Sequence, residues 1–225
     1  MTMVYVSTPG SQVQAALLCD LPMLVSFALY APWLQRGGYM GSSSHLLLDS
    51  GAFSELTTGI KVDVHAYVDW VAEFPYAEAW AGLDDISGDW RRSEANYLHG
   101  GFPTFHDTDP PELLDDLIPM AREEQGWIGL GLKPPRTGRE AWLRRTIERI
   151  PDDLHIHGWA LGRYAHCPGM ASRDSSHAWR EWEKIRNALG PWLTSAEAMG
   201  LAVKKVQREG RSIETVECDQ MELPA

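Results

Sequence analysis

The sequence predicts an α/β fold, a compact (β/α)8 TIM barrel in which residues 1–225 make a single domain. Short apolar runs alternate with amphipathic stretches along most of the chain. Several of these runs are apolar throughout, which is typical of parallel strands covered on both faces. Eight such runs match the strand number of the barrel. An open doubly wound sheet would show the same alternation and remains the rival interpretation.

Each expected strand is an apolar run that ends at polar residues or a turn. The eight are Val4–Ser7, Met23–Tyr30, Leu46–Phe53, Ala79–Ile86, Phe102–His106, Trp127–Leu132, His155–Leu161 and a short strand ending near Asp174.

Helix start and stop signals lie between these runs. They predict a helix that Asp109 caps and that runs to Gly126. They also predict helices over Val62–Phe74, over Glu140–Ile150 and from Ser175 or Ser176 to Leu189. A capping box, Thr194-x-x-Glu197, is expected to open one more helix, the last of the chain. The tail after about residue 211 is only loosely specified.

Composition narrows the class of protein. A net charge of −11 argues against a non-specific nucleic-acid coat protein. Basic residues between Lys133 and Arg149 fit either a solvated helix face or a phosphate-binding rim. Three widely spaced cysteines favour a reducing cytosol. The one apolar stretch of membrane length, Ala15–Leu34, carries Asp20 and two prolines, so we expect a cytoplasmic protein without a membrane partner.

Carboxylates stand at the expected carboxyl ends of three strands, where barrels place their chemistry. Asp49 follows three leucines, Asp84 and Asp85 follow Ala-Gly-Leu, and Asp174 lies between a short strand and a helix start. Each of these acids alone could equally be a helix cap or a satisfied turn residue. Together at one barrel mouth they fit glycosyl chemistry, in which one carboxylate attacks the anomeric carbon while another manages protons.

Two further features fall on strand ends. Gly129, Leu130 and Gly131 would let a flat ligand approach the backbone. His106 and His177 are candidates for contact with a phosphate or sugar. A metal site built from His155, His157, His166 and Cys167 is the less favoured reading of those residues, so no metal or other cofactor is expected.

The order of these segments resembles that of the tRNA-guanine transglycosylases. The matching segments are Asp49-Ser50-Gly51-Ala52-Phe53-Ser54, Leu83-Asp84-Asp85, Gly129-Leu130-Gly131-Leu132, Trp159-Ala160-Leu161-Gly162 and Arg173-Asp174-Ser175. The match runs from about residue 23 to 180. No Cys-x-Cys-x-x-Cys…His motif follows, so the zinc-binding subdomain of the tRNA enzymes is not expected. The pattern is closest to the DpdA-type DNA-guanine transglycosylases of phages and bacteria.

The resemblance implies roles for individual residues. Asp174 would be the nucleophile that attacks C1′ and releases guanine, Asp49 the general acid/base, and Asp84 the reader of the purine edge. The backbone around Gly129 to Gly131 would contact the exchanged base. The other residues expected to bind substrate are Ser50, Gly51, Phe53, Asp85, His106 and His177. A 7-deazaguanine base such as preQ0 would then attack the covalent intermediate.

The sequence leaves several alternatives open. DNA is the favoured polymer and tRNA the alternative, in the cytoplasm of a bacterium or of a phage host. A barrel N-glycosidase would use the same acids with water in place of the incoming base. A non-catalytic nucleic-acid-binding protein would tolerate loss of Asp49 and Asp174. A homodimer or an accessory protein is also left open.

Overall fold

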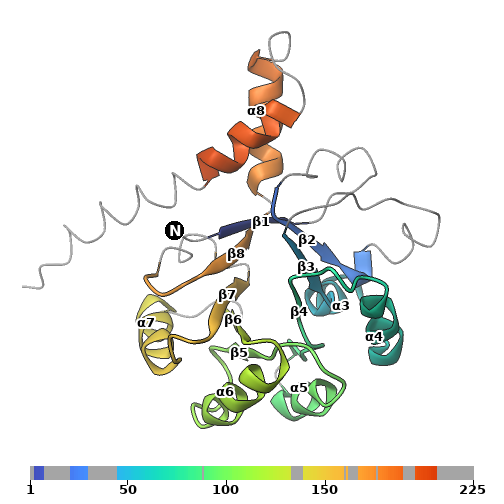
Figure 1. Ribbon diagram of the computed structural model, residues 1–225, viewed down its shortest axis with the longest axis vertical. Helices are drawn as coiled ribbons and strands as arrows, with labels where there is room; N and C mark the ends of the chain where they lie inside the picture. Colours follow the sequence, from blue (N-terminus) through green and yellow to red (C-terminus); the bar gives the residue numbers. More distant parts are fainter. Residues whose placement is uncertain are drawn as a thin grey trace, which may run out of the picture.

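The computed structural model describes residues 3–7, 21–29, 45–87, 89–132, 139–159, 161, 167–175, 177–189 and 196–206. Within this part of the chain, eight parallel strands form one sheet in the order β4-β3-β2-β1-β8-β7-β6-β5 (Figure 1). The strands are β1 (Met3–Ser7), β2 (Met23–Ser26), β3 (Leu46–Asp49), β4 (Ala79–Trp80), β5 (Thr104–His106), β6 (Trp127–Gly131), β7 (His155–Trp159) and β8 (Ser172–Ser175).

The two end strands of this order meet and close the sheet. Ala81, just after β4, forms a parallel bridge with Phe102, just before β5. The Gly82 amide donates to the Phe102 carbonyl at 2.9 Å, and the Phe102 amide donates to the Trp80 carbonyl at 3.0 Å. The (β/α)8 architecture is therefore confirmed, and the doubly wound alternative is wrong because an open sheet has no such closing contact.

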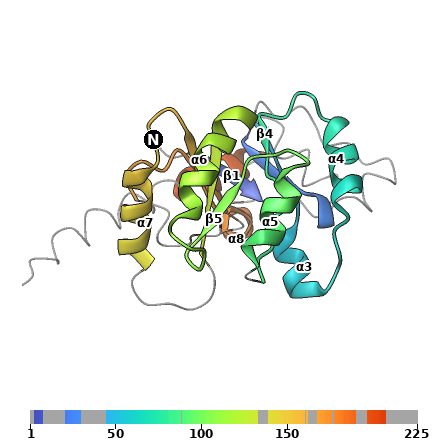
Figure 2. The same cartoon turned by 90° about the horizontal axis from the view of Figure 1, so that it is seen from below.

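Helices surround the sheet on its outer side (Figure 2). They are α3 (Ala52–Thr58), α4 (Val64–Ala72), α5 (Trp90–Tyr97), α6 (Leu113–Glu124), α7 (Arg139–Arg149) and α8 (His177–Leu189), followed by a helix over 196–206. Asp63 caps α4 by accepting from the Ala66 amide at 2.9 Å. No helix in the described part of the chain is long and apolar enough to cross a membrane.

The core has three parts. The barrel interior is filled by large side chains that include Tyr5, Phe102 and Trp127. Two outer clusters lie between the sheet and the helices, one centred on β1–β3 and the other on β5–β7. The helix 196–206 buries Met199 and Val203 in the first of these clusters, so it and α8 cover β1 and the strands beside it.

Six of the described strands, β2 to β7, are shorter than the sequence predicts. The run Leu46–Phe53 is a strand only to Asp49, because Gly51 adopts a left-handed conformation with φ 85° and starts α3. Likewise β2 ends at Ser26 and β4 at Trp80. The apolar runs continue beyond the strands because the following turns and helices are also packed against the core.

Candidate active site at the carboxyl ends of the strands

Asp49 and Asp174 both face the barrel interior at the carboxyl ends of their strands. Leu47 belongs to the interior cluster, and Asp49, two residues later on β3, is on the same face. On β8, the Ser172 hydroxyl contacts His157 inside the barrel at 2.8 Å, and Asp174 follows two residues later. Both carboxylates therefore stand at the barrel mouth, as expected from the sequence.

The electrostatic environment of Asp49 favours its protonated form. Burial raises the pKa of Asp49 from 3.8 to about 7, against the opposing effects of the Gly51 amide and the Ser26 hydroxyl. The negative charges of Asp84 and Asp174 raise this pKa further. Three of the predicted acids thus interact at one site, and Asp49 is set to exchange a proton near neutral pH.

The turn after Asp49 is built for close packing. A Cβ on Gly51 would lie 2.4 Å from the Cβ of Ala28, so only glycine fits this left-handed position. The Ser50 side chain is buried beside it. Phe53, predicted to bind substrate, lies on the outer surface of α3 with 61% of its area exposed.

Asp84 is held by His106, and His106 is held in turn by Asp109. The Nε2 atom of His106 lies 3.0 Å from Asp84 Oδ2, and its Nδ1 atom lies 3.4 Å from Asp109 Oδ2. The His106 amide also donates to Asp109 Oδ2 at 2.8 Å. Hydrogen bonds to the two acids outweigh burial and raise the pKa of His106 to about 9.

This arrangement corrects one prediction. The sequence predicts that Asp109 caps the following helix, but α6 begins at Leu113 with Glu112 before it. Asp109 binds His106 instead, because the turn 107–109 brings its carboxylate back to the end of β5. His106 therefore has both ring nitrogens directed at carboxylates.

Asp85 organises the loop after β4. Its carboxylate accepts from the Ser87 amide at 2.7 Å and pairs with Arg92 of α5 at 3.0 Å. Its own amide donates to the Ser93 hydroxyl at 2.7 Å. The predicted contact of Asp85 with a substrate stays a prediction.

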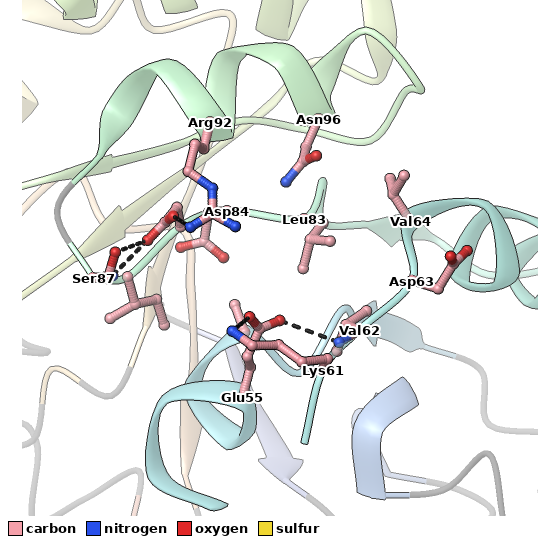
Figure 3. Close-up of a pocket in the computed structure, with 13 residues that line it drawn as sticks. Glu55, Lys61, Val62, Asp63, Val64, Leu83, Asp84, Ser87, Arg92 and Asn96 are labelled. Atoms are coloured by element: carbon pink, nitrogen blue, oxygen red, sulfur yellow. Dashed lines mark hydrogen bonds and ion pairs between the residues drawn. The ribbon is translucent and has the colours of Figure 1, made fainter. Parts of the chain in front are cut away.

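A pocket of about 470 Å³ is lined by Asp84 and Asp85 and lies between α3, the start of α4 and α5. Figure 3 shows Asp84 on the loop after β4, with Arg92 and Asn96 of α5 on one side and Glu55 and Lys61 on the other. Lys61 pairs with Glu55 at 2.6 Å. The other residues that line the pocket are Ala52, Val62, Asp63, Val64, Leu83, Ile86 and Ser87.

The glycines of β6 make room for protein rings. A Cβ on Gly129 would lie 2.3 Å from the Trp159 indole nitrogen, and one on Gly131 would lie 2.5 Å from His106 Cδ2. Leu130 packs in the outer cluster, away from the barrel interior. The space at these glycines is thus taken by Trp159 and His106, and backbone contact with a base stays a prediction.

The histidines of β7 are packed within the barrel. The Ser172 hydroxyl lies 2.7 Å from His155 Nε2 and 2.8 Å from His157 Nδ1. Burial lowers the pKa of His157 to about 3. Cys167 belongs to the outer cluster and His166 lies outside the described residues. Among the described residues no group of three or more His, Cys, Asp or Glu side chains is arranged to hold a metal.

Two buried tyrosines on helices α4 and α5, which the sequence does not single out, hydrogen-bond to the backbone near the acid cluster. Tyr67 of α4 donates to the Ala81 carbonyl at 2.6 Å, and the Thr104 amide donates to the Tyr97 hydroxyl at 3.0 Å. Burial first, and then nearby carboxylates, raise both tyrosine pKa values. An apolar helix pattern predicts a buried tyrosine but not the atom its hydroxyl reaches.

Several predicted features lie outside what the structure describes. His177 starts α8, but its side chain is not among those described, and neither are Lys133, Arg136, Thr194 and the tail after 211. Of the basic stretch, Arg144 pairs with Glu140 and Arg149 with Asp115, both at 2.8 Å. These two arginines fit the solvated-face interpretation.

Comparison with known proteins gives a fold and no family. No family model and no curated protein matches the chain. One solved structure is similar: a Coccidioides immitis protein described as "a putative fructose-1,6-biphosphate aldolase", with a TM-score of 0.55 and 14% identity over 96% of this chain and 92% of that one. At this identity the likeness supports the barrel fold alone.

Proposed function

We propose that the protein is a base-exchange enzyme, a guanine transglycosylase that replaces guanine in DNA with a 7-deazaguanine base of the preQ0 type. The observation that carries the proposal is the pair of acids at the barrel mouth. Asp49, with a pKa raised to about 7, is electrostatically coupled to Asp174 and Asp84. A retaining glycosyl transfer uses one acid that titrates near neutrality as general acid/base and a second carboxylate as nucleophile.

The proposed reaction has two displacements. A carboxylate oxygen of Asp174 attacks C1′ of the nucleotide, the C1′–N9 bond breaks, and Asp49 gives its proton to the departing guanine. Asp49, now ionised, accepts the proton from N9 of the incoming 7-deazaguanine. That nitrogen attacks C1′ and releases the Asp174 carboxylate, so the configuration at C1′ is retained.

The order of the segments supports guanine as the exchanged base and DNA as the polymer. The acids lie in the order of the guanine transglycosylase motifs, and the pattern most resembles the DpdA-type enzymes, which act on DNA. A duplex base would have to be flipped out to reach a barrel mouth. The same chemistry on tRNA is the alternative, which a parallel assay separates.

The test is incorporation of labelled guanine, and separately of preQ0, into single-stranded DNA, duplex DNA and unmodified tRNA. The proposal expects incorporation into DNA by the native protein and none by Asp174→Asn. Asp115→Asn is a matched control, because Asp115 is an exposed acid on α6 that forms an ion pair with Arg149.

The outcomes separate the alternatives. Incorporation into tRNA alone reassigns the polymer, and release of free guanine without incorporation indicates an N-glycosidase. Salt-dependent DNA binding with no reaction, unchanged in Asp174→Asn, indicates a non-catalytic binding protein.

A further inference from the structure

The ring of His106 lies between two carboxylates in a closed environment. Its side chain is 6% exposed, and those of Asp84 and Asp109 are 12% and 4% exposed. Each ring nitrogen faces one acid, at 3.0 Å for Asp84 and 3.4 Å for Asp109. A neutral imidazole has only one N–H, so both contacts can be donated only by the doubly protonated ring.

Packing against β6 also holds the His106 ring in place. Gly131 leaves the space that the imidazole occupies, since a Cβ there would stand 2.9 Å from Nε2. On the other side, Asp109 is fixed because its Oδ2 atom also accepts from the backbone amide of His106. The ring therefore has little freedom to turn toward a substrate phosphate or sugar.

Asp84 links the fixed ring of His106 to the pocket. Its Oδ2 atom faces His106, none of the described residues donates a hydrogen bond to its Oδ1 atom, and the residue lines the pocket. A carboxylate with one oxygen bound by an imidazole N–H presents its other oxygen as a hydrogen-bond acceptor.

We infer that His106, backed by Asp109, is a positioning and specificity-determining residue that fixes Asp84 as a hydrogen-bond acceptor for N–H groups of the exchanging base. The inference rests on the proposed function for the identity of the ligand. An acceptor at this place favours the N1–H and 2-amino donors of guanine, and it disfavours adenine, whose N1 is itself an acceptor. His106 thus acts through Asp84 and does not touch the base.

Two measurements test the inference. The first is the ¹⁵N NMR spectrum of the histidine rings at pH 7, with the His106 signals assigned by their loss in His106→Asn. Two protonated ring nitrogens are expected, and a neutral single tautomer would overturn the inference. This readout needs no substrate, so it is independent of the proposed function.

The second measurement is the binding of guanine and adenine to the whole protein by calorimetry. Asp109→Asn keeps the shape of the side chain and removes its charge. Guanine affinity is expected to fall about tenfold in Asp109→Asn and by roughly ten- to a hundredfold in His106→Asn, with the preference over adenine reduced. The exposed His99→Asn serves as the control.

The outcomes distinguish the two proposals. Unchanged guanine affinity and preference in both variants, with native circular dichroism, would refute the positioning role even if base exchange occurs. Conversely, a doubly protonated His106 and weakened guanine binding in the variants, without any exchange into DNA or tRNA, would sustain the positioning role and refute the proposed reaction.

Discussion

Gly131 lies directly against the imidazole of His106, at a place where a Cβ would stand 2.5 Å from Cδ2 of the ring. The two residues are register partners on β6 and β5. The space beside Gly131, which could have admitted a ligand, is occupied by the imidazole of His106. The pair links the strand-end glycines to the acid cluster, since His106 contacts Asp84.

Replacing Gly131 with alanine should displace the His106 ring. The new methyl group would have to push the imidazole away from Asp84, and such overpacking costs about 1–3 kcal/mol of unfolding free energy. Chemical denaturation measures this loss, and guanine binding should weaken with it. Gly200→Ala is the control, because nothing lies within 4 Å of its added Cβ. Full stability and full guanine affinity in Gly131→Ala would contradict the packing described.

Asp49→Asn should stabilise the protein at high pH. The pKa of Asp49 is raised from 3.8 to about 7 on folding, so the folded state binds a proton more tightly than the unfolded state. Ionising Asp49 therefore lowers stability as pH rises from about 4 to 7, by up to about 4 kcal/mol. Denaturation of both proteins at pH 4 and pH 8 measures this difference. The gain from the substitution should be present at pH 8 and nearly absent at pH 4; equal gains at both values would disagree with a raised pKa.

Asp109→Asn should show the opposite pH dependence. The pKa of His106 is raised from 6.5 to about 9, so its ion pairs stabilise the folded state fully below pH 6.5 and are lost as pH rises through 9. The native protein should accordingly be more stable than Asp109→Asn at pH 6, with the gap closing above pH 9. Urea denaturation across this range measures the gap. A gap independent of pH would mean that Asp109 stabilises the fold without regard to the charge of His106.

The rate of base exchange should fall as pH rises through about 7. The first displacement needs a protonated Asp49 to protonate the departing guanine, and that form is lost above its pKa. The profile of kcat/KM against pH for the nucleic acid measures this limb. In Asp49→Asn the residual rate should lose the inflection; an unchanged inflection would assign it to another group.

The fold could be predicted from the sequence because its signal is distributed along the whole chain. Eight apolar runs, each followed by a turn, need no knowledge of partners to be counted. The boundaries could not be predicted so well. Leu46–Phe53 is apolar beyond its strand because Ala52 starts a helix that is also buried.

The acids could be predicted as site residues, but their contacts could not. Asp49 and Asp174 could be predicted because each lies at the carboxyl end of an expected strand. Asp109 has the sequence of a helix cap, Asp-Pro-Pro, and only the turn of the chain shows that it pairs with His106. Arg92 and Asn96 of α5 and Glu55 of α3 line the same pocket, and no local sequence pattern indicates that the two helices meet there.

The central claim is that Asp174 forms a covalent bond to the sugar. Intact-protein mass spectrometry, after mixing with guanine-containing DNA and acid quenching, tests it most directly, with peptide mapping to locate the bond. We expect a nucleic-acid adduct on the peptide that contains Asp174, absent in Asp174→Asn and discharged by added preQ0. An adduct on another residue, or exchange that proceeds undiminished in Asp174→Asn, would contradict it.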